Sequence, residues 1–331
     1  MKQGYYGIDV TRGKEKVTPL ICGAPFFNIK KEEVMKDIMT VAVVNFKVDA
    51  CNKEGNLSRI CGYAEAAAKR GADLVLLPEL CLYGYDYYVD TNIPQEEKIK
   101  TAEMKDGPSA QAVAEIAKKY GIYIVFGMAE KKEDTPDSIL YNSAVAIGPD
   151  GVIDTYRKMH PFETESVWCE KGDKPFMFDT PWGPVGISIC FDTYQFPELQ
   201  RHYCAKGCRL VLNPTAFIEE VPFDGSRDAF CQTFGKTLEY GVICNTIYIA
   251  TANLTGMDTE CYFGGGSSIM GPKITPFYET MLHYYAGGPE DNQAELLMAT
   301  IDLSLAERRL FVDKEITGVP DYRPEVYKTF I

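Results

Sequence analysis

The chain has 331 residues, of which 46% are hydrophobic and 24% are charged, a mixture typical of a globular protein with a sizeable core. Its formal net charge of −13 argues against binding to nucleic acid or to an anionic membrane surface, because both require a basic face. No run of 18 apolar residues is present, so no transmembrane helix is expected. The first residues lack the pattern of a signal peptide, and a cytoplasmic location is the expected default.

The cysteines and histidines do not form a recognisable metal motif. Eleven cysteines are scattered along the chain, and the closest pair, Cys204 and Cys208, has no second pair to complete a zinc site. Only three histidines are present. We therefore predict no metal and no cofactor, and we expect most of the cysteines to be small buried hydrophobic residues.

Strands and helices are predicted to alternate from residue 38 onward. Apolar and β-branched runs predict strands at 39–48, 73–77, 122–128, 141–147, 152–157, 184–189, 210–213, 247–252, 267–270 and 296–301. Helices are predicted at about 56–69, 109–120, 196–206 and 227–240, the last capped by Ser226. The turn sequence at 148–151 predicts a hairpin between two of the strands.

This alternation has no linker within it, so it predicts one α/β domain over residues 38–305, with helices on the outer faces of sheets. Residues 1–37 are polar and lack a clear period, and we interpret them as an N-terminal extension. Residues 306–331 carry large apolar side chains in an irregular polar context. We interpret them as a C-terminal arm that packs on the domain or on a neighbouring subunit.

Cys190 is the first candidate for chemistry. It ends an apolar strand and is followed by a predicted helix. Such an elbow exposes the side chain and points backbone N–H groups at it, which favours a nucleophilic thiolate and an oxyanion site. The alternative is one more core cysteine at the end of a strand.

A cysteine nucleophile needs a proton acceptor, and none of the three histidines has an evident claim to that role. Glu79 follows the buried strand DLVLLP, at the sheet edge where α/β active sites usually lie. Partial burial would raise its pKa and make it a usable base near neutral pH. Lys158 follows another strand, where its positive charge could stabilise an oxyanion.

Three segments, in this order, resemble the signatures of the nitrilase or carbon–nitrogen hydrolase superfamily. They are LVLLPEL around Glu79, YRKMHP around Lys158 and GISICFDTYQFPE around Cys190. Further similar segments are NPTAF, GGGSSIMGP and the terminal DYRPEVY. The resemblance extends over about residues 38–327.

The resemblance implies a four-layer α-β-β-α sandwich that often forms a homodimer or a higher homo-oligomer. It also implies an amidase without a cofactor, in which Glu79 takes the proton of Cys190 and the thiolate attacks a small amide. Lys158 and the backbone N–H of Phe191 would then hold the oxyanion.

Members of this superfamily often carry a second glutamate shortly after the lysine. In the amidase arrangement it lies about eight residues on, between a proline and a tryptophan. Here the eighth position is Ser166, and Glu165 lies one residue early. We choose Glu165 to orient substrate and water, with Glu163 and Glu170 as the alternatives.

The residues after Cys190 bear on the substrate. Members that hydrolyse carboxylate-bearing amides tend to place an arginine within about four residues of the nucleophile, where a guanidinium can grip the anion. Thr193, Tyr194 and Gln195 fill those places here. The expected substrate is therefore a small neutral or cationic linear amide. Candidate substrate-binding residues are Tyr85, Trp168 and Thr193.

Two other functions stay open. Within the same fold, the chain could be a nitrilase or an N-carbamoyl amine or amino acid hydrolase. Outside the enzymes, it could be a catalytically silent scaffold or sensor, although the intact set of glutamate, lysine and cysteine argues against that. The only expected partners are the small-molecule substrate and further copies of the chain.

Overall fold

The computed structural model describes residues 35–219, 235–274 and 280–328. The predicted extension therefore lies almost wholly outside the described residues, as do Ser226 and most of the helix predicted at 227–240. Within the described part, the helix α8 spans Lys236–Asn245 and so continues five residues past the predicted end.

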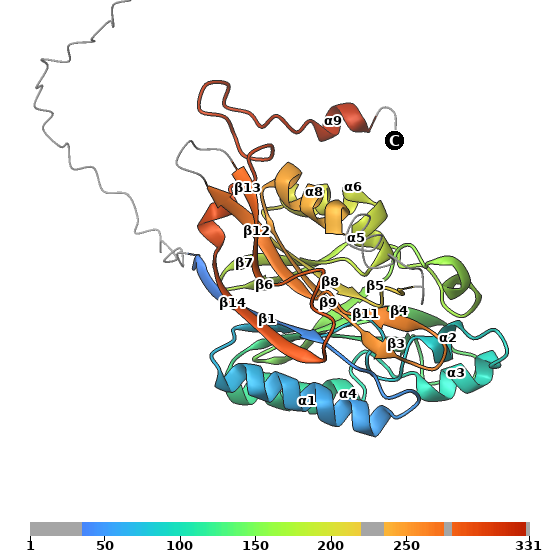
Figure 1. Cartoon of the computed structure of the whole chain (residues 1–331). Helices are drawn as coiled ribbons and strands as arrows, with labels where there is room; N and C mark the ends of the chain where they lie inside the picture. Colours follow the sequence, from blue (N-terminus) through green and yellow to red (C-terminus); the bar gives the residue numbers. More distant parts are fainter. Residues whose placement is uncertain (1–34, 220–234, 275–279, 329–331) are drawn as a thin grey trace, which may run out of the picture. The chain divides into compact units, whose positions relative to one another are not determined.

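Two six-stranded sheets form the centre of the described part (Figure 1). The order in the first sheet is β14 (Glu295–Asp302), β1 (Ile38–Asn45), β2 (Leu74–Leu76), β3 (Tyr123–Lys131), β4 (Leu140–Gly148) and β5 (Gly151–Arg157). The order in the second is β13 (Thr280–Gly287), β12 (Ser268–Ile274), β9 (Tyr248–Asn253), β8 (Leu210–Thr215), β7 (Gly183–Ile187) and β6 (Phe176–Thr180). A separate small hairpin joins β10 (Thr255–Met257) to β11 (Tyr262–Gly264).

Both sheets are built on the same plan. Strands β1, β2 and β3 are parallel in the first sheet, and β7, β8 and β9 are parallel in the second, while the outer strands are antiparallel. Parallel strands end at the same edge of a sheet, so the residues that follow them gather there. This arrangement brings the chain that follows β2 and the chain that follows β7 to the candidate site.

Helices cover the outer face of each sheet. Helices α1 (Lys53–Lys69) and α4 (Pro108–Tyr120) lie against the first sheet, and α5 (Phe191–Gln195), α6 (Pro197–Ala205) and α8 lie against the second (Figure 1). Short helices are α2 (Asp86–Val89), α3 (Gln95–Thr101), α9 (Pro324–Tyr327), η1 (Glu163–Val167) and η3 (Leu303–Leu305). The predicted α-β-β-α sandwich is confirmed.

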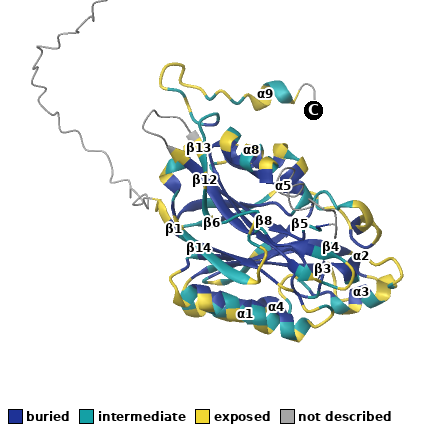
Figure 2. Cartoon of the chain, in the orientation of Figure 1, coloured by how far each residue is buried: buried dark blue, intermediate teal, exposed yellow. Residues whose placement is uncertain are grey.

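The alternation of side chains along β1 shows how this layering follows from the sequence. Val41 and Val43 join the hydrophobic cluster between the two sheets, whereas Ala42 and Val44 join the cluster under α1 and α4. Because successive strand residues point to opposite faces, a strand buried on both faces is apolar throughout. Figure 2 shows these strands as buried, with exposed residues gathered on the outer helices.

Several boundaries differ from the prediction for identifiable reasons. Helix α1 begins at Lys53 rather than near residue 56, because the Asn52 side chain accepts a hydrogen bond from the Gly55 N–H at 3.0 Å. Strands β6 and β13 were not predicted. The segment Thr280–Gly287 is rich in tyrosine and histidine, and its strand forms by pairing with β12 along its whole length.

The predicted C-terminal arm begins by contacting the second sheet's helices. The Arg308 N–H donates to the Thr246 carbonyl, and its guanidinium donates to the Cys204 carbonyl at 2.9 Å. The Phe311 side chain is buried. The domain boundaries predicted at 37/38 and 305/306 stay predictions.

Candidate active site

Glu79, Lys158 and Cys190 all follow strand ends that meet in one place. Glu79 lies three residues after β2, Lys158 directly after β5, and Cys190 three residues after β7. Strand β5 runs in the same direction as β3, because each is antiparallel to β4. Residues far apart in the sequence therefore reach the same edge, as the elbow and strand-end patterns predicted.

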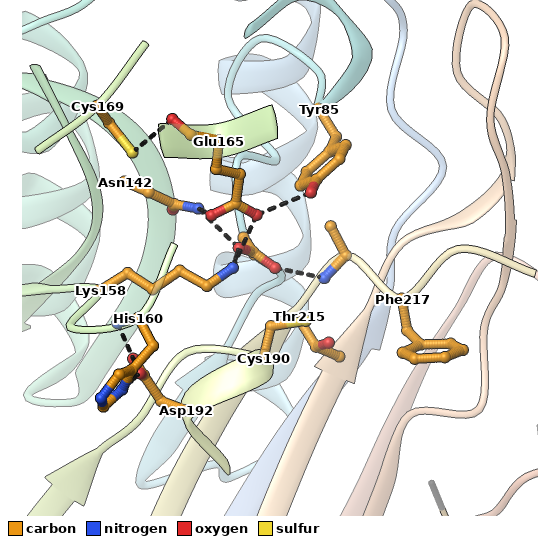
Figure 3. Close-up of polar contacts among 12 residues, drawn as sticks. Tyr85, Asn142, Lys158, His160, Glu165, Cys169, Cys190, Asp192, Thr215 and Phe217 are labelled. Carbon is orange, nitrogen blue, oxygen red and sulfur yellow. Dashed lines mark hydrogen bonds and ion pairs between the residues drawn. The ribbon is translucent and has the colours of Figure 1, made fainter. Parts of the chain in front are cut away.

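The Lys158 ammonium lies between two buried carboxylates (Figure 3). Its Nζ donates to Glu79 Oε1 at 2.7 Å and to Glu165 Oε1 at 2.8 Å. All three side chains are at most 1% exposed. Buried charges of this kind are tolerated only when they are paired and hydrogen-bonded, and each of the two carboxylates accepts from further donors.

Glu165 is the glutamate that the fold brings to the Lys158 ammonium, rather than its two alternatives. It belongs to the short 3-10 helix η1, which turns its side chain inward, whereas Glu163 and Glu170 are exposed. Tyr85 donates its hydroxyl to Glu165 Oε1 at 2.7 Å. The Cys169 thiol donates to the Glu165 carbonyl at 3.3 Å, which ties this turn in place (Figure 3).

Glu79 is held from both sides of its carboxylate. Oε1 accepts from Lys158, and Oε2 accepts from the backbone N–H of Ala216 at 2.7 Å. Its backbone lies against Gly127 of β3, where a Cβ would come within 2.5 Å of the Glu79 Cα and of the Leu80 nitrogen. Glycine is therefore needed at position 127, because backbone atoms cannot move aside as a flexible side chain does.

Cys190 stands at a strained elbow. Its backbone has φ 46° and ψ −106°, a region that L-residues rarely occupy, and it directly precedes α5. The Cys190 N–H donates to the Asn213 side chain and to the Pro214 carbonyl, each at 3.0 Å, which fixes the turn. Within the described part of the chain, the next N–H, that of Phe191, has no hydrogen-bond partner and remains available to an oxyanion.

The pKa values of these groups follow from their surroundings. Burial raises the pKa of Glu79 more than the Lys158 charge lowers it. Burial alone would lower the pKa of Lys158, but the two carboxylates raise it well above its ordinary value. Burial and the Glu79 charge raise the pKa of the Cys190 thiol well above its ordinary value. The resting thiol is therefore protonated near neutral pH, and its reactivity requires a base.

Two residues that organise the site were not predicted from the sequence. Asn142 of β4 donates to Glu79 Oε1 at 2.7 Å and to Glu165 Oε2 at 3.3 Å. Asp192, directly after the elbow, accepts from the backbone N–H groups of Met159 and His160 and from the Tyr156 hydroxyl at 2.7 Å. It thereby joins the Lys158 segment to the Cys190 elbow. The only available signal for Asp192 was its place two residues after the cysteine.

A cavity of about 320 Å³ opens onto Cys190. Its aromatic lining residues are Tyr85, Phe162, Phe191, Tyr194 and Phe217. Ala216 and Ile218 add apolar surface, and Glu163 and Gln195 are the polar lining residues beside the cysteine. A mostly apolar cavity with a few converging polar groups is the usual form of a small-molecule site.

Two of the predicted substrate-binding residues do not reach this cavity. Trp168 is 2% exposed and packs against Tyr88 with ring centroids 4.9 Å apart, because η1 turns it toward α2. Thr193 is buried in α5 and donates its hydroxyl to the Ser188 carbonyl at 2.8 Å. Neither position supports the predicted substrate contact, whereas Tyr85 lines the cavity.

The described ranges contain neither a metal-ligand cluster nor a membrane-spanning helix. No group of three or more histidine, cysteine, aspartate or glutamate side chains in those ranges is arranged to hold a metal ion. No helix there has the length and apolar composition needed to cross a membrane.

The fold and this arrangement define an α-β-β-α hydrolase, and comparison with known families agrees. A family model described as carbon–nitrogen hydrolase matches residues 40–309. The chain belongs to the carbon–nitrogen hydrolase family, within the nitrilase superfamily, and the predicted enzyme class is confirmed.

Similar proteins carry related names. The chain is 33% identical over 278 residues to a protein named nitrilase from Pyrococcus abyssi, covering 83% of this chain and 94% of that protein. It is 31% identical over 285 residues to the omega-amidase NIT2 of Bos taurus, covering 81% and 91% respectively. In structure it is similar to an amidase of the nitrilase superfamily from Nesterenkonia sp. AN1, with a TM-score of 0.65 and 21% identity, covering 90% of this chain and 100% of that one.

Proposed function

We propose that this enzyme is an amidase that hydrolyses a small linear amide through a thioester on Cys190. The observation that carries the proposal is the buried ion triplet of Glu79, Lys158 and Glu165, beside a strained cysteine that faces a substrate-sized cavity. Maintaining two carboxylates and an ammonium out of water is costly, and such arrangements are typical of catalytic sites.

In the first half of the reaction, the Glu79 carboxylate takes the proton from the Cys190 thiol, and the sulfur attacks the amide carbon. The carbonyl oxygen becomes an oxyanion, which the Lys158 ammonium and the Phe191 N–H stabilise. Glu79 then gives its proton to the amide nitrogen. The carbon–nitrogen bond breaks, ammonia or an amine leaves, and a thioester remains.

In the second half, water attacks the thioester carbon while Glu79 accepts a proton from the water. The carbon–sulfur bond breaks, the carboxylic acid leaves, and Glu79 returns the proton to sulfur. Glu165 would orient the substrate and the water. Support for a nucleophilic cysteine comes from a structure of a glutamate-to-glutamine mutant of the Nesterenkonia amidase, in which the acetamide moiety of fluoroacetamide is added covalently at the active-site cysteine.

The direct test is an ammonia-release screen over small amides, nitriles, N-carbamoyl amines and N-carbamoyl acids. We expect amides to be the fastest class and Cys190→Ala to abolish their turnover. Ammonia release at the full rate in Cys190→Ala would contradict the thiol mechanism. Faster turnover of nitriles or carbamoyl compounds would favour the alternative substrates, and no turnover of any class would favour a scaffold.

The proposal also includes a cytoplasmic location and a homodimer or higher homo-oligomer. In support of an oligomer, the outer side of α8 exposes the apolar side chains of Tyr240, at 58%, and Ile243, at 47%. Exposed apolar pairs on a helix face are typical of protein interfaces. Light scattering after size-exclusion chromatography tests the oligomeric state, and Tyr240→Glu should shift it toward the monomer.

A further inference from the structure

The walls of the cavity contain no basic side chain among the described lining residues. The aromatic rings of Phe162, Phe191 and Phe217 present apolar surface to a substrate, and their faces attract cations. A substrate carboxylate would find no cationic partner on these walls. An apolar substrate chain that ends in a positive charge would pack favourably against these aromatic walls.

Glu163 adds a free negative charge at this cavity. Its side chain lines the cavity and is exposed to solvent, and its carboxylate makes no hydrogen bond or ion pair with the part of the chain that the structure describes. Its backbone is held at φ 43°, in the left-handed region. Such strain in a residue other than glycine persists only where the surrounding structure imposes it, and it clusters at functional sites.

The buried triplet contributes in the same direction. Two carboxylates, Glu79 and Glu165, face one ammonium, Lys158, so the ionised triplet carries a charge of about −1. Glu163 makes the cleft more negative, and the chain as a whole has a formal charge of −13. Each of these charges attracts a cationic substrate and repels an anionic one.

We propose that Glu163 is a specificity-determining residue that binds a protonated amine on the substrate. The substrate class is then a linear amide whose carbonyl is separated from an ammonium group by an apolar chain. This inference rests on the proposed amidase function and deepens it. It also separates this enzyme from hydrolases that select a substrate carboxylate by means of an arginine.

The test compares three amides of matched length: 6-aminohexanamide, which is cationic, hexanamide, which is neutral, and adipic acid monoamide, which is anionic. We expect kcat/KM to follow that order. Glu163→Gln should lower the ratio of kcat/KM for the cationic amide to that for the neutral one by about fivefold, the effect of one solvent-accessible ion pair. Glu163→Lys should raise the relative rate of the anionic amide.

The matched control is Glu170→Gln, which removes an equally exposed carboxylate that does not line the cavity. It should leave the ratio as in the unmodified enzyme. An unchanged ratio in Glu163→Gln, with amide hydrolysis intact, would overturn the inference while leaving the amidase function standing.

A binding measurement separates the inference from the proposed function. In the Cys190→Ala background, calorimetry should give tighter binding of 6-aminohexanamide than of hexanamide, and this preference should fall when Glu163→Gln is added. If the unmodified enzyme hydrolysed no amide but the binding preference held, the proposed function would fail and the inference would survive. Equal binding of the two amides would overturn the inference.

Discussion

Two clusters of buried or half-buried carboxylates lie on either side of Tyr85, and they compensate their charges in different ways. Around the Tyr85 hydroxyl, Glu79 and Glu165 share the ammonium of Lys158. Around the Tyr85 backbone, Asp86 and Asp258 have no cationic partner among the described residues and accept hydrogen bonds from backbone N–H groups instead. The first cluster holds charges that can move a proton, and the second fastens a loop.

The contacts of the second cluster are reciprocal. Asp258 Oδ2 accepts from the N–H groups of Tyr85 at 2.7 Å and Asp86 at 3.1 Å. Asp86 Oδ2 accepts from the N–H groups of Thr259, Glu260 and Cys261. Each carboxylate thus binds backbone N–H groups of the segment that carries the other carboxylate. The Oδ1 atoms of both aspartates are buried without a partner among the described residues.

A buried cation opposes the rise that burial causes in the pKa of a neighbouring carboxylate. In both clusters burial raises the pKa, of Glu79 in one and of Asp258 to about 6 in the other. At Glu79 the positive charge of Lys158 opposes that rise, whereas at Asp258 only backbone dipoles do. Substitutions in each cluster therefore have different expected consequences.

Removal of the shared cation should have the largest effect. Lys158→Met leaves two buried carboxylates unpaired, so we expect unfolding to require about 3–5 kcal/mol less free energy. The same change removes the oxyanion cation and should lower kcat by about 10²–10³-fold. Urea denaturation and amide turnover measure the two effects. Lys171→Met, at an exposed lysine, is the control, and an equal loss of stability there would contradict the explanation.

Removal of the base should abolish the reactivity of the cysteine. Because the pKa of Cys190 is raised, its thiol loses its proton only to Glu79, and Glu79→Gln should slow both turnover and alkylation of Cys190 by about 10²–10⁴-fold. Iodoacetamide labelling followed by peptide mass spectrometry measures the alkylation. The exposed Cys51 in the same sample is the internal control. Equal labelling of Cys190 in both proteins would show that Glu79 is not its base.

The side chains of the site differ in whether their positions could be predicted from the sequence. Glu79 and Cys190 could be singled out from the sequence because each follows an apolar strand, whereas Lys158 follows the partly polar strand GVIDTYR and was assigned through the resemblance to the superfamily. Glu165 was chosen over Glu163 and Glu170 from its spacing after Lys158, and the 3-10 turn that directs it inward is marked by no periodic pattern in the sequence. The same turn places Trp168 in the core against Tyr88, and Trp168 does not line the cavity.

The roles of Asn142 and of the pair Asp86 and Asp258 could not be predicted from the sequence. Asn142 lies within the mostly apolar strand β4, and its importance arises from two carboxylates that are 63 and 23 residues away in the sequence. Asp86 and Asp258 meet only because the β10–β11 hairpin returns to the loop after β2. The sandwich itself could be predicted, because alternating strands and helices leave few other ways to bury their apolar faces.

An added charge next to the triplet should sharpen the contrast in titration. Asn142 donates to both glutamates, so Asn142→Asp removes two donors and adds a third carboxylate. The pKa of Glu79 should rise further, and the acidic limb of the kcat/KM profile should move to higher pH by about one unit or more. Asn245→Asp, at a buried asparagine of α8, is the matched control. An equal shift of the acidic limb in both variants would show that the shift does not arise from the contacts of Asn142 with the two glutamates.

The smallest effect is expected at the cation-free cluster. The pKa of Asp258 is about 6 in the folded enzyme, and its value is about 4 in an unfolded chain. Between these values the folded state holds a proton that the unfolded state has lost. This group therefore contributes stability at low pH that is lost as the pH rises from about 4 to about 6. Asp258→Asn should remove that pH dependence.

The asparagine can still accept from the Tyr85 and Asp86 N–H groups through its oxygen, and it carries no charge that burial would disfavour. At pH 7.5 we therefore expect the Tm of Asp258→Asn to equal or slightly exceed that of the unmodified enzyme, whereas at pH 4.5 it should not. Thermal unfolding at the two pH values measures this. Asp258→Ala, which lacks the acceptor, should be less stable at both, and a Tm of Asp258→Asn that is equally depressed at both would contradict a stability contribution that depends on the ionisation of Asp258.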